Sequence, residues 1–345
     1  MDQNNLERLR SKYTESSTPQ IEDPVFQEAA SSAFDSEGRR QFPYGGLPTL
    51  LDFPHQPDLS ELDIALIGVP MDLGVTNRTG ARFGPRALRT IERIGPFNHA
   101  LRVTPGKRER IGDIGDVPLQ SRYSLNQSIA DIEAEFRRLK AAGVRTLAAG
   151  GDHSVTYPIL KALGADEPLG MVHIDAHCDT AGPFEGEKFH HGGPFRLAVL
   201  DGVLDPARSI QIGIRGASEY LWEFSTDAGM TVVHAEEVDA LGIEAVIQQA
   251  LEVIGSGPTY ITVDVDGIDP AFAPGTGTPE VGGLTPREVQ RVLRGLSSAQ
   301  IIGGDVVEVA PQYDPSTNTA HVGAQMMFEI LSLMVLTHRA QAQSP

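Results

Sequence analysis

The sequence predicts an α/β protein, with three layers (α/β/α) built around a central, mostly parallel sheet. Short apolar runs alternate with helix-like segments through most of the chain, as in successive βαβ units. Acidic residues and histidines follow several of these apolar runs. Because ligands of open parallel sheets bind beyond the carboxyl ends of the strands, we expect one functional site at that edge of the sheet.

The composition favours a soluble protein and is compatible with a bound cation. The chain has 345 residues, and its hydrophobic fraction of 40% is enough for a sizeable core. Its 46 acidic residues outnumber 28 basic ones, for a formal net charge of −18. This balance argues against nucleic acid or an anionic membrane as a partner, because both attract clustered Lys and Arg. It suits a cationic substrate or bound metal ions.

A cytoplasmic location is expected. The single cysteine, Cys178, excludes an intrachain disulfide and suits a reducing compartment. The first residues lack the basic and apolar regions of a signal peptide. We expect no membrane-spanning helix, since no apolar run reaches the roughly 18 residues that one needs.

Residues 1–60 are predicted to form an N-terminal arm. This segment is polar and contains six prolines, which interrupt any long helix. We expect one or two short helices in it, packed on the core or on a neighbouring subunit. Residues 61–345 are predicted to form a single catalytic domain, because no internal repeat or linker divides them.

The first half of this domain opens with an apolar run at residues 62–69, a predicted strand. The glycine-rich segment 74–84 lacks the spacing and the Lys-Ser/Thr end of a phosphate loop, so we expect a connecting loop and no nucleotide site. Pro85 suits the first turn of a helix. Apolar runs and helical spacing then alternate, predicting a helix at 124–142, a strand at 144–149, a helix at 154–163 and a strand at 169–174.

The second half continues the same alternation to the end of the chain. Its predicted strands are short β-branched or apolar runs, and its predicted helices have apolar residues at helical spacing. In order, we expect a helix at 192–204, a strand at 209–214, a helix at 218–228, a strand at 231–234, a helix at 243–254, a strand at 260–263, a helix at 286–297, a strand at 301–309 and a helix after residue 317.

Asp175, His177 and Asp179 follow the predicted buried strand 169–174 at alternate positions. In extended backbone these three side chains would share a face. Two carboxylates and an imidazole at the end of a buried strand resist desolvation unless a cation holds them. A divalent metal ion is the simplest such cation, and a helix cap or a hydrogen-bonded turn is the alternative.

Two further strand ends carry similar side chains. His153 follows the strand at 144–149, where Asp152 or Ser154 could cap the next helix. Asp264 and Asp266 alternate at the end of another strand, with no basic residue nearby in sequence to pair with them. Asp269, before a proline, suits either a ligand role or backbone support.

The predicted ligands suggest two metal ions. Four carboxylates carry four negative charges, which two divalent cations would balance. Oxygen-rich ligation with some imidazole suits Mn²⁺, with Ni²⁺, Co²⁺ or Fe²⁺ as alternatives. Two ions about 3.5–4 Å apart can lower the pKa of a shared water to about 7, which indicates metal-assisted hydrolysis. The predicted metal ligands are His153, Asp175, His177, Asp179, Asp264 and Asp266.

Glu308 closes the apolar strand at 301–309, where a carboxylate is costly to bury without a partner. A cationic group of a substrate would be one such partner.

Four motifs together resemble the ureohydrolases, the family of arginase, agmatinase and their relatives. They are Gly-Gly-Asp-His-Ser (150–154), Asp-Ala-His-Cys-Asp (175–179), Asp-Val-Asp-Gly-Ile-Asp-Pro (264–270) and Val-Glu-Val-Ala-Pro (307–311). Segments 186–188, 191–192 and 273–280 are similar to the agmatinase-like branch. The resemblance implies an arginase-like fold around two Mn²⁺ ions, and a homotrimer or homohexamer, with mixed assembly with a paralogous subunit left open.

The resemblance also implies how the residues divide the work. His153, Asp175, Asp179 and Asp264 would hold one ion, and Asp175, His177, Asp264 and Asp266 would hold the other. A hydroxide between the ions would attack the guanidinium carbon, and the intermediate would release urea and an amine.

Asp179, His191 and Glu308 are the predicted catalytic residues. Glu308 would bind the guanidinium group, and His191 would bind substrate and carry a proton to the leaving amine. His190 is the rival for that role, and His191 is favoured because a glycine follows it.

The substrate is left open by the sequence. Agmatine is the default for this branch, with guanidinobutyrate, guanidinopropionate, free guanidine and an N-substituted biguanide as alternatives. A carboxylated substrate would require a cation such as Arg78, Arg82 or Lys188. Gly193 replaces a threonine found in many relatives, which bears on the substrate pocket. A non-catalytic assembly subunit is disfavoured because all six ligands are present, and an amide deacetylase because it needs one ion only.

Overall fold

The computed structural model describes residues 2–14, 21–32, 44–92, 94–216 and 219–342. It divides into two compact units, residues 1–42 and residues 43–345. The smaller unit contains two short helices, α1 (Gln3–Tyr13) and α2 (Pro24–Ser31), each started by an aspartate that accepts a hydrogen bond from the first turn. Neither helix has a buried residue. Packing of the arm on a neighbouring subunit stays a prediction.

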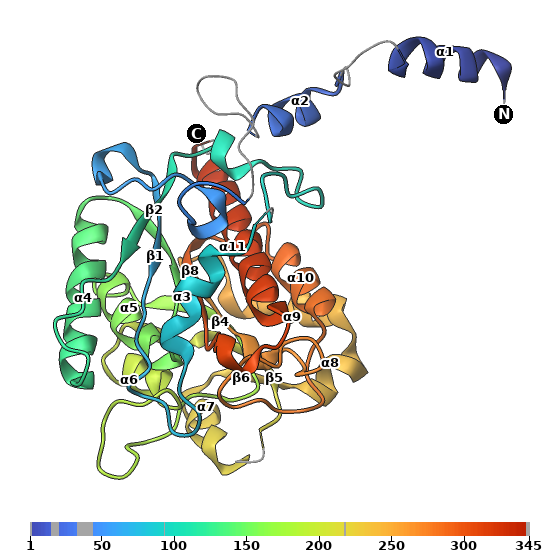
Figure 1. The fold of residues 1–345 in the computed structure, drawn as a ribbon. Helices are drawn as coiled ribbons and strands as arrows, with labels where there is room; N and C mark the ends of the chain where they lie inside the picture. Colours follow the sequence, from blue (N-terminus) through green and yellow to red (C-terminus); the bar gives the residue numbers. More distant parts are fainter. Residues whose placement is uncertain (1, 15–20, 33–43, 93, 217–218, 343–345) are drawn as a thin grey trace. The chain divides into compact units, whose positions relative to one another are not determined.

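The larger unit is built on one eight-stranded sheet, in which every pairing is parallel (Figure 1). The strand order is β2-β1-β3-β8-β7-β4-β5-β6. The strands are β1 (Ile64–Gly68), β2 (Ile111–Asp116), β3 (Arg145–Ala149), β4 (Leu169–Ile174), β5 (Leu204–Ile214), β6 (Thr231–His234), β7 (Thr259–Asp264) and β8 (Ile301–Val307). The α/β class and the parallel sheet predicted from the sequence are confirmed.

Helices cover both faces of the sheet, which completes the three layers. In Figure 1, α4, α5 and α6 lie on one side of the strands, and α9, α10 and α11 lie on the other. The helices of the larger unit are α3 (Gly84–Arg89), α4 (Leu125–Ala141), α5 (Thr156–Leu163), α6 (Pro194–Leu200), α7 (Glu223–Ala228), α8 (Ala235–Leu241), α9 (Ile243–Ile254), α10 (Pro286–Gly295) and α11 (Asn318–Ala342).

Side chains of alternate strand residues pack into two different apolar clusters, one under each helical layer. On β4, Met171 belongs to one cluster, while Val172 and Ile174 belong to the other. This alternation follows from the two faces of a strand. Both faces are apolar because both are covered, so the strands read as continuous apolar runs.

Several elements differ from those predicted from the sequence. The edge strand β2 was not expected. The predicted helix at 192–204 is the shorter α6, and Leu204 already begins β5. A separate helix, α8, follows β6 directly.

The expectation of no helix apolar enough for a membrane is also corrected. Residues Asn318–Thr337 of α11 are long and apolar enough, with a mean hydropathy of 1.4. However, 78% of that window is buried inside the fold. Here the apolar surface of α11 packs against β8 and neighbouring helices, as a core helix does.

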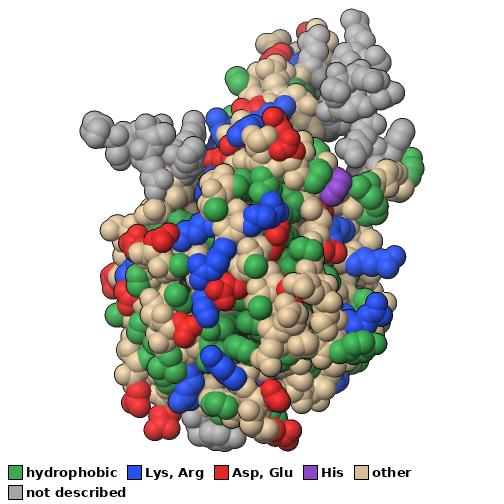
Figure 2. Space-filling view, turned by 90° about the vertical axis from the view of Figure 1, so that its left-hand side faces the viewer, with side chains coloured by type: hydrophobic (Ala, Val, Ile, Leu, Met, Phe, Trp, Pro, Cys, Tyr) green, Lys and Arg blue, Asp and Glu red, His purple; other side chains and the backbone are tan. Residues whose placement is uncertain are grey.

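Figure 2 shows one face of the structure, on which Lys and Arg side chains are scattered among acidic and apolar ones. The exclusion of nucleic acid as a partner stays a prediction from the acidic composition.

Candidate metal centre

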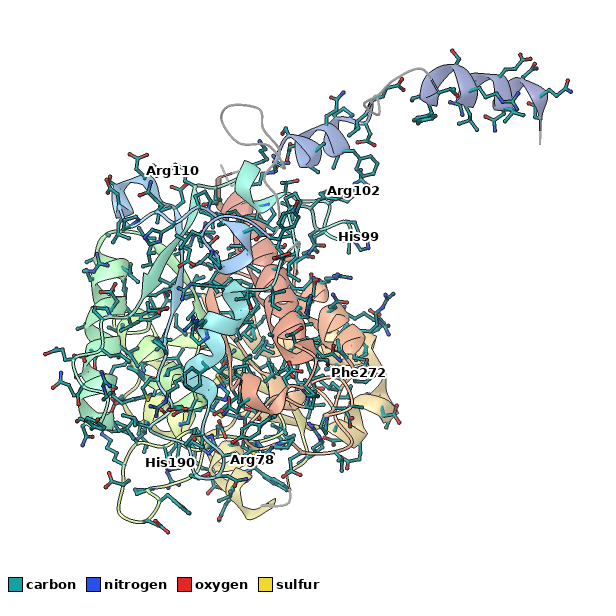
Figure 3. All side chains as sticks on the ribbon, in the orientation of Figure 1. Arg78, His99, Arg102, Arg110, His190 and Phe272 are labelled. Atoms are coloured by element: carbon teal, nitrogen blue, oxygen red, sulfur yellow. The ribbon has the colours of Figure 1, made fainter. Side chains whose placement is uncertain are left out.

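The four sequence motifs meet at one edge of the sheet. They follow β3, β8, β7 and β4, which are consecutive neighbours in the strand order. All strands are parallel, so their carboxyl ends lie at the same edge. Figure 3 shows Arg78 and His190, from loops of this edge, at the opposite end of the larger unit from Arg110, which precedes β2.

His153 lies at the centre of the first group of predicted ligands. Its Nδ1 atom is 3.1 Å from Asp175 Oδ2, 3.0 Å from Asp179 Oδ2 and 3.3 Å from Asp264 Oδ2. The imidazole is fully buried, and Nδ1 makes no hydrogen bond with any residue that the structure describes. A buried nitrogen without a hydrogen bond is rare, and a cation held between it and the three carboxylates would satisfy all four groups. These residues therefore fit a metal ion.

A second group of predicted ligands adjoins the first through Asp175. His177 Nδ1 is 3.5 Å from Asp175 Oδ1 and 3.2 Å from Asp266 Oδ2. Asp175 also belongs to the group of potential ligands around His153. Asp175 is therefore placed to act as a bridging ligand between two neighbouring ions.

The electrostatics of the cluster favour bound cations. Burial and the facing carboxylates raise the pKa of Asp264 well above its usual value. Burial and Asp175 likewise raise the pKa of Asp266, to about 6. Ionising all these carboxylates at neutral pH thus requires nearby positive charge, which divalent ions would supply.

Turns, rather than extended backbone, bring the side chains together. The reasoning that Asp175, His177 and Asp179 share one face of an extended strand is wrong, because β4 ends at Ile174. Asp175 Oδ1 accepts a hydrogen bond from the backbone N–H of His177 at 2.7 Å. Asp179 then has a left-handed backbone, with φ of 53°.

The segments at the end of β7 and after β3 contain the same kind of turn. Asp264 Oδ1 accepts from Asp266 N at 2.8 Å, and Asp152 Oδ1 accepts from Ser154 N at 2.9 Å. In each case an aspartate accepts a hydrogen bond from the backbone N–H two residues ahead and so forms a turn just after the strand. Asp152 therefore caps the turn that carries His153, one of the two capping residues expected there.

Sequence reasoning missed His173, which lies in β4 and is fully buried. Its Nε2 is 2.7 Å from Asp175 Oδ2, and its Nδ1 is 3.0 Å from Gln211 Nε2. Because the amide nitrogen of Gln211 can only donate, Nδ1 accepts and Nε2–H donates to Asp175. Gln211 also donates to the carbonyl oxygen of Cys178 at 2.6 Å. His173 therefore orients Asp175, and Gln211 orients His173.

Glu308 and His191 contact each other beside the cluster. Glu308 Oε1 accepts hydrogen bonds from His153 N and from His191 Nδ1, both at 2.9 Å. Its other oxygen, Oε2, is buried and has no hydrogen-bond partner among the described residues. Burial lowers the pKa of His191, but the hydrogen bond and charge of Glu308 outweigh it and raise the pKa to about 9. The backbone of Glu308 is left-handed, with φ of 62°, a strain often found at functional sites.

Other residues singled out from the sequence lie in different environments. His190 Nε2 donates to the carbonyl oxygen of Gly182, at 2.8 Å. Asp269 accepts from the backbone N–H groups of residues 271, 282 and 283, which is the backbone-support role. Cys178 is buried, and burial raises the pKa of its thiol, so it suits packing and not nucleophilic attack.

The three cationic side chains considered for binding a carboxylated substrate have different partners. Arg82 forms an ion pair with the buried carboxylate of Asp72. Arg78 donates to the carbonyl oxygens of Thr276 and Gly277, at 2.9 and 3.0 Å. Lys188 lies over the ring of Phe189.

Comparison with known proteins agrees with the geometry. The model of the arginase family matches residues 62–332. The chain is 48% identical to guanidinopropionase of Pseudomonas aeruginosa over 84% of this chain and 92% of that protein. It is 43% identical to mitochondrial agmatinase of Gallus gallus over 84% and 86%, respectively. The solved structure of proclavaminate amidino hydrolase from Streptomyces clavuligerus superposes with a TM-score of 0.82 at 36% identity, covering 86% of this chain and all of that one.

Proposed function

The chain belongs to the arginase family, and from this membership we propose that it hydrolyses a small guanidino compound to urea and an amine. The observation that carries the proposal is the convergence of two histidines and four carboxylates at adjacent strand ends. His153, Asp175, Asp179 and Asp264 would hold one divalent ion, and Asp175, His177, Asp264 and Asp266 the other. When bound there, the ions would supply water activated for nucleophilic attack.

Glu308 is proposed to bind the guanidinium group. Its free Oε2 atom is buried, so a charged hydrogen bond from a substrate N–H would offset the cost of burying the carboxylate. The other oxygen is fixed by His153 and His191, which holds the carboxylate in one orientation.

His191 is proposed to deliver a proton to the leaving amine. Its imidazole is held by Glu308 on one side and lies 2.7 Å from the hydroxyl of Thr76 on the other. A histidine held beside the bound guanidinium can act as the general acid at the C–N bond that breaks.

Mn²⁺ is proposed as the metal, with Ni²⁺ as the alternative, because each ion would have one imidazole among oxygen ligands. We further propose a cytoplasmic homotrimer or homohexamer. Sedimentation that detects only monomer at micromolar concentration would contradict this assembly.

Agmatine is the first candidate substrate. Guanidinopropionate is the second, because the chain is 48% identical to a guanidinopropionase. Arg82 is engaged by Asp72, which leaves Arg78 and Lys188 as the candidates for binding a carboxylate.

The test is urea release from agmatine, guanidinopropionate, guanidinobutyrate, arginine, guanidine and a biguanide, after reconstitution with Mn²⁺ or Ni²⁺. One substrate turned over far faster than the others would identify both the substrate and the metal. If a chain with two bound ions releases no urea from any of them, the proposed reaction on these compounds is wrong.

A further inference from the structure

Arg215, the first residue after β5, uses every N–H group of its guanidinium to bind backbone carbonyls. Nε donates to Val281 O at 3.2 Å. Nη1 donates to Gly213 O at 3.1 Å and Gly267 O at 3.2 Å. Nη2 donates to Asp266 O at 2.7 Å and Glu280 O at 2.6 Å. The rigid fork of arginine is the one side chain that offers five donors in fixed directions.

Four of the five carbonyls that the Arg215 guanidinium binds belong to the loop after β7, which carries Asp266. One of them is the carbonyl of Asp266 itself, and Gly267 follows it. The backbone N–H of Arg215 also donates to Ala176 O, between Asp175 and His177, at 2.8 Å. No contact with the backbone of His153 or Asp179 accompanies these hydrogen bonds in the described part of the chain.

The surroundings of Arg215 support the same ligands from other directions. Gly216 N also donates to Ala176 O, and a Cβ at Gly216 would lie only 2.8 Å from the His177 ring. The loop that includes Glu280 also contains Thr278, whose hydroxyl donates to Asp266 Oδ2 at 3.0 Å. The guanidinium thus joins two parts of the loop after β7 to the end of β5, and the backbone N–H groups of residues 215 and 216 hold the loop of His177.

We infer that Arg215 is a positioning residue for the metal ion held by His177 and Asp266, and that its guanidinium acts by fixing the backbone of Asp266. The inference rests on the proposed binuclear centre. It predicts a selective effect, because the ion held by His153 and Asp179 does not depend on this arginine.

The test is Mn²⁺ binding to the metal-free full-length chain, with Arg215→Lys as the variant. Lysine keeps the positive charge but places its donors on one atom, so it cannot bind five carbonyls. Loss of such outer support reduces metal affinity by about 10–100-fold. We expect the Mn²⁺ ion held by His177 and Asp266 to bind about 10–100-fold more weakly. The ion held by His153 and Asp179 should bind as in the wild type. The electron paramagnetic resonance spectrum should change from that of a coupled pair to that of single ions.

Arg208→Lys is the matched control. Arg208 lies on the same strand and also donates to backbone carbonyls, those of Ile254 and Pro258, but at the opposite end of the sheet. This variant should bind both ions as the wild type does. Gly283→Ala is a second variant, which keeps Arg215 but disturbs its position. The new Cβ would lie 2.4 Å from Nη2 of Arg215 and would displace the guanidinium.

Unchanged binding of both ions by Arg215→Lys and Gly283→Ala would overturn the inference. Equal weakening of both ions, or a loss of fold shared with Arg208→Lys, would overturn it too, because Arg215 would then be a general support. The Mn²⁺ titration uses no substrate. Its result can therefore be interpreted even if the proposed hydrolysis is not observed. A wild-type chain that binds fewer than two Mn²⁺ ions would contradict the proposed centre and the inference together.

Discussion

At the scale of single residues, the ligand types could be predicted from the sequence, but the groups that orient them only in part. His173 precedes Asp175 by two positions and is the one histidine in the predicted buried strand 169–174, so its burial next to Asp175 could have identified it. Gln211 could not be identified, because it comes from the neighbouring strand β5 and reaches His173 only through the sheet register.

Replacing His173 by leucine should weaken metal binding. The substitution removes the N–H that orients Asp175 and leaves Gln211 with the Cys178 carbonyl but without the His173 nitrogen as an acceptor. We expect metal affinity to fall about 10–100-fold, measured by Mn²⁺ titration of the metal-free chain. Wild-type affinity in a folded variant would show that Asp175 needs no such support.

Replacing His191 by alanine should lower turnover about 100-fold or more, because the proposed proton donor is lost. Metal content, measured by elemental analysis, should stay at the wild-type value. His190→Ala is the control, and it should retain far more activity, since His190 bonds the Gly182 carbonyl and not Glu308. Metal loss in His191→Ala would instead indicate that His191 is a ligand.

At the scale of helices and strands, most elements could be predicted because the covered sheet gives long apolar runs. The edge strand β2 could not, since its sequence Ile-Gly-Asp-Ile-Gly-Asp has only two apolar side chains and carries two aspartates. The strand order could not be predicted either. It is that order which makes β3, β8, β7 and β4 neighbours and so brings distant motifs together.

The start of α10 offers a test of local stability away from the metal centre. Thr285 and Glu288 form a capping box, in which each side chain accepts from the backbone N–H of the other. Thr285→Ala should lower the free energy of unfolding by about 1 kcal/mol, measured by urea denaturation.

Thr90→Ala is the matched control for that substitution, because among the described residues the exposed hydroxyl of Thr90 bonds only the carbonyl of Ala87. Its effect should stay within about 0.5 kcal/mol. Equal effects of the two substitutions would mean that the capping box adds no stability.

At the scale of the whole molecule, the strongest coupling is between the fold and the metal ions. Four carboxylates from β4 and β7 face one another in the core, so ions that neutralise them should stabilise the native state. We expect chelation to lower the melting temperature and added Mn²⁺ to restore it. A free Mn²⁺ concentration about 1,000 times the dissociation constant should raise the free energy of unfolding by about 4 kcal/mol.

Asp175→Asn serves as the control for this effect, because it removes the carboxylate shared by both groups of ligands. Its melting temperature should respond little to Mn²⁺. If the wild type melted at the same temperature with and without Mn²⁺, the buried carboxylates would have to be neutralised by protons instead.

The most direct measurement is anomalous X-ray diffraction from crystals of the Mn²⁺-loaded protein, recorded on both sides of the manganese absorption edge. We expect two anomalous peaks about 3.5–4 Å apart, one beside His153 and Asp179 and the other beside His177 and Asp266, with Asp175 and Asp264 between them. A single peak, or peaks away from these side chains, would contradict a binuclear centre built from the ends of β3, β4 and β7.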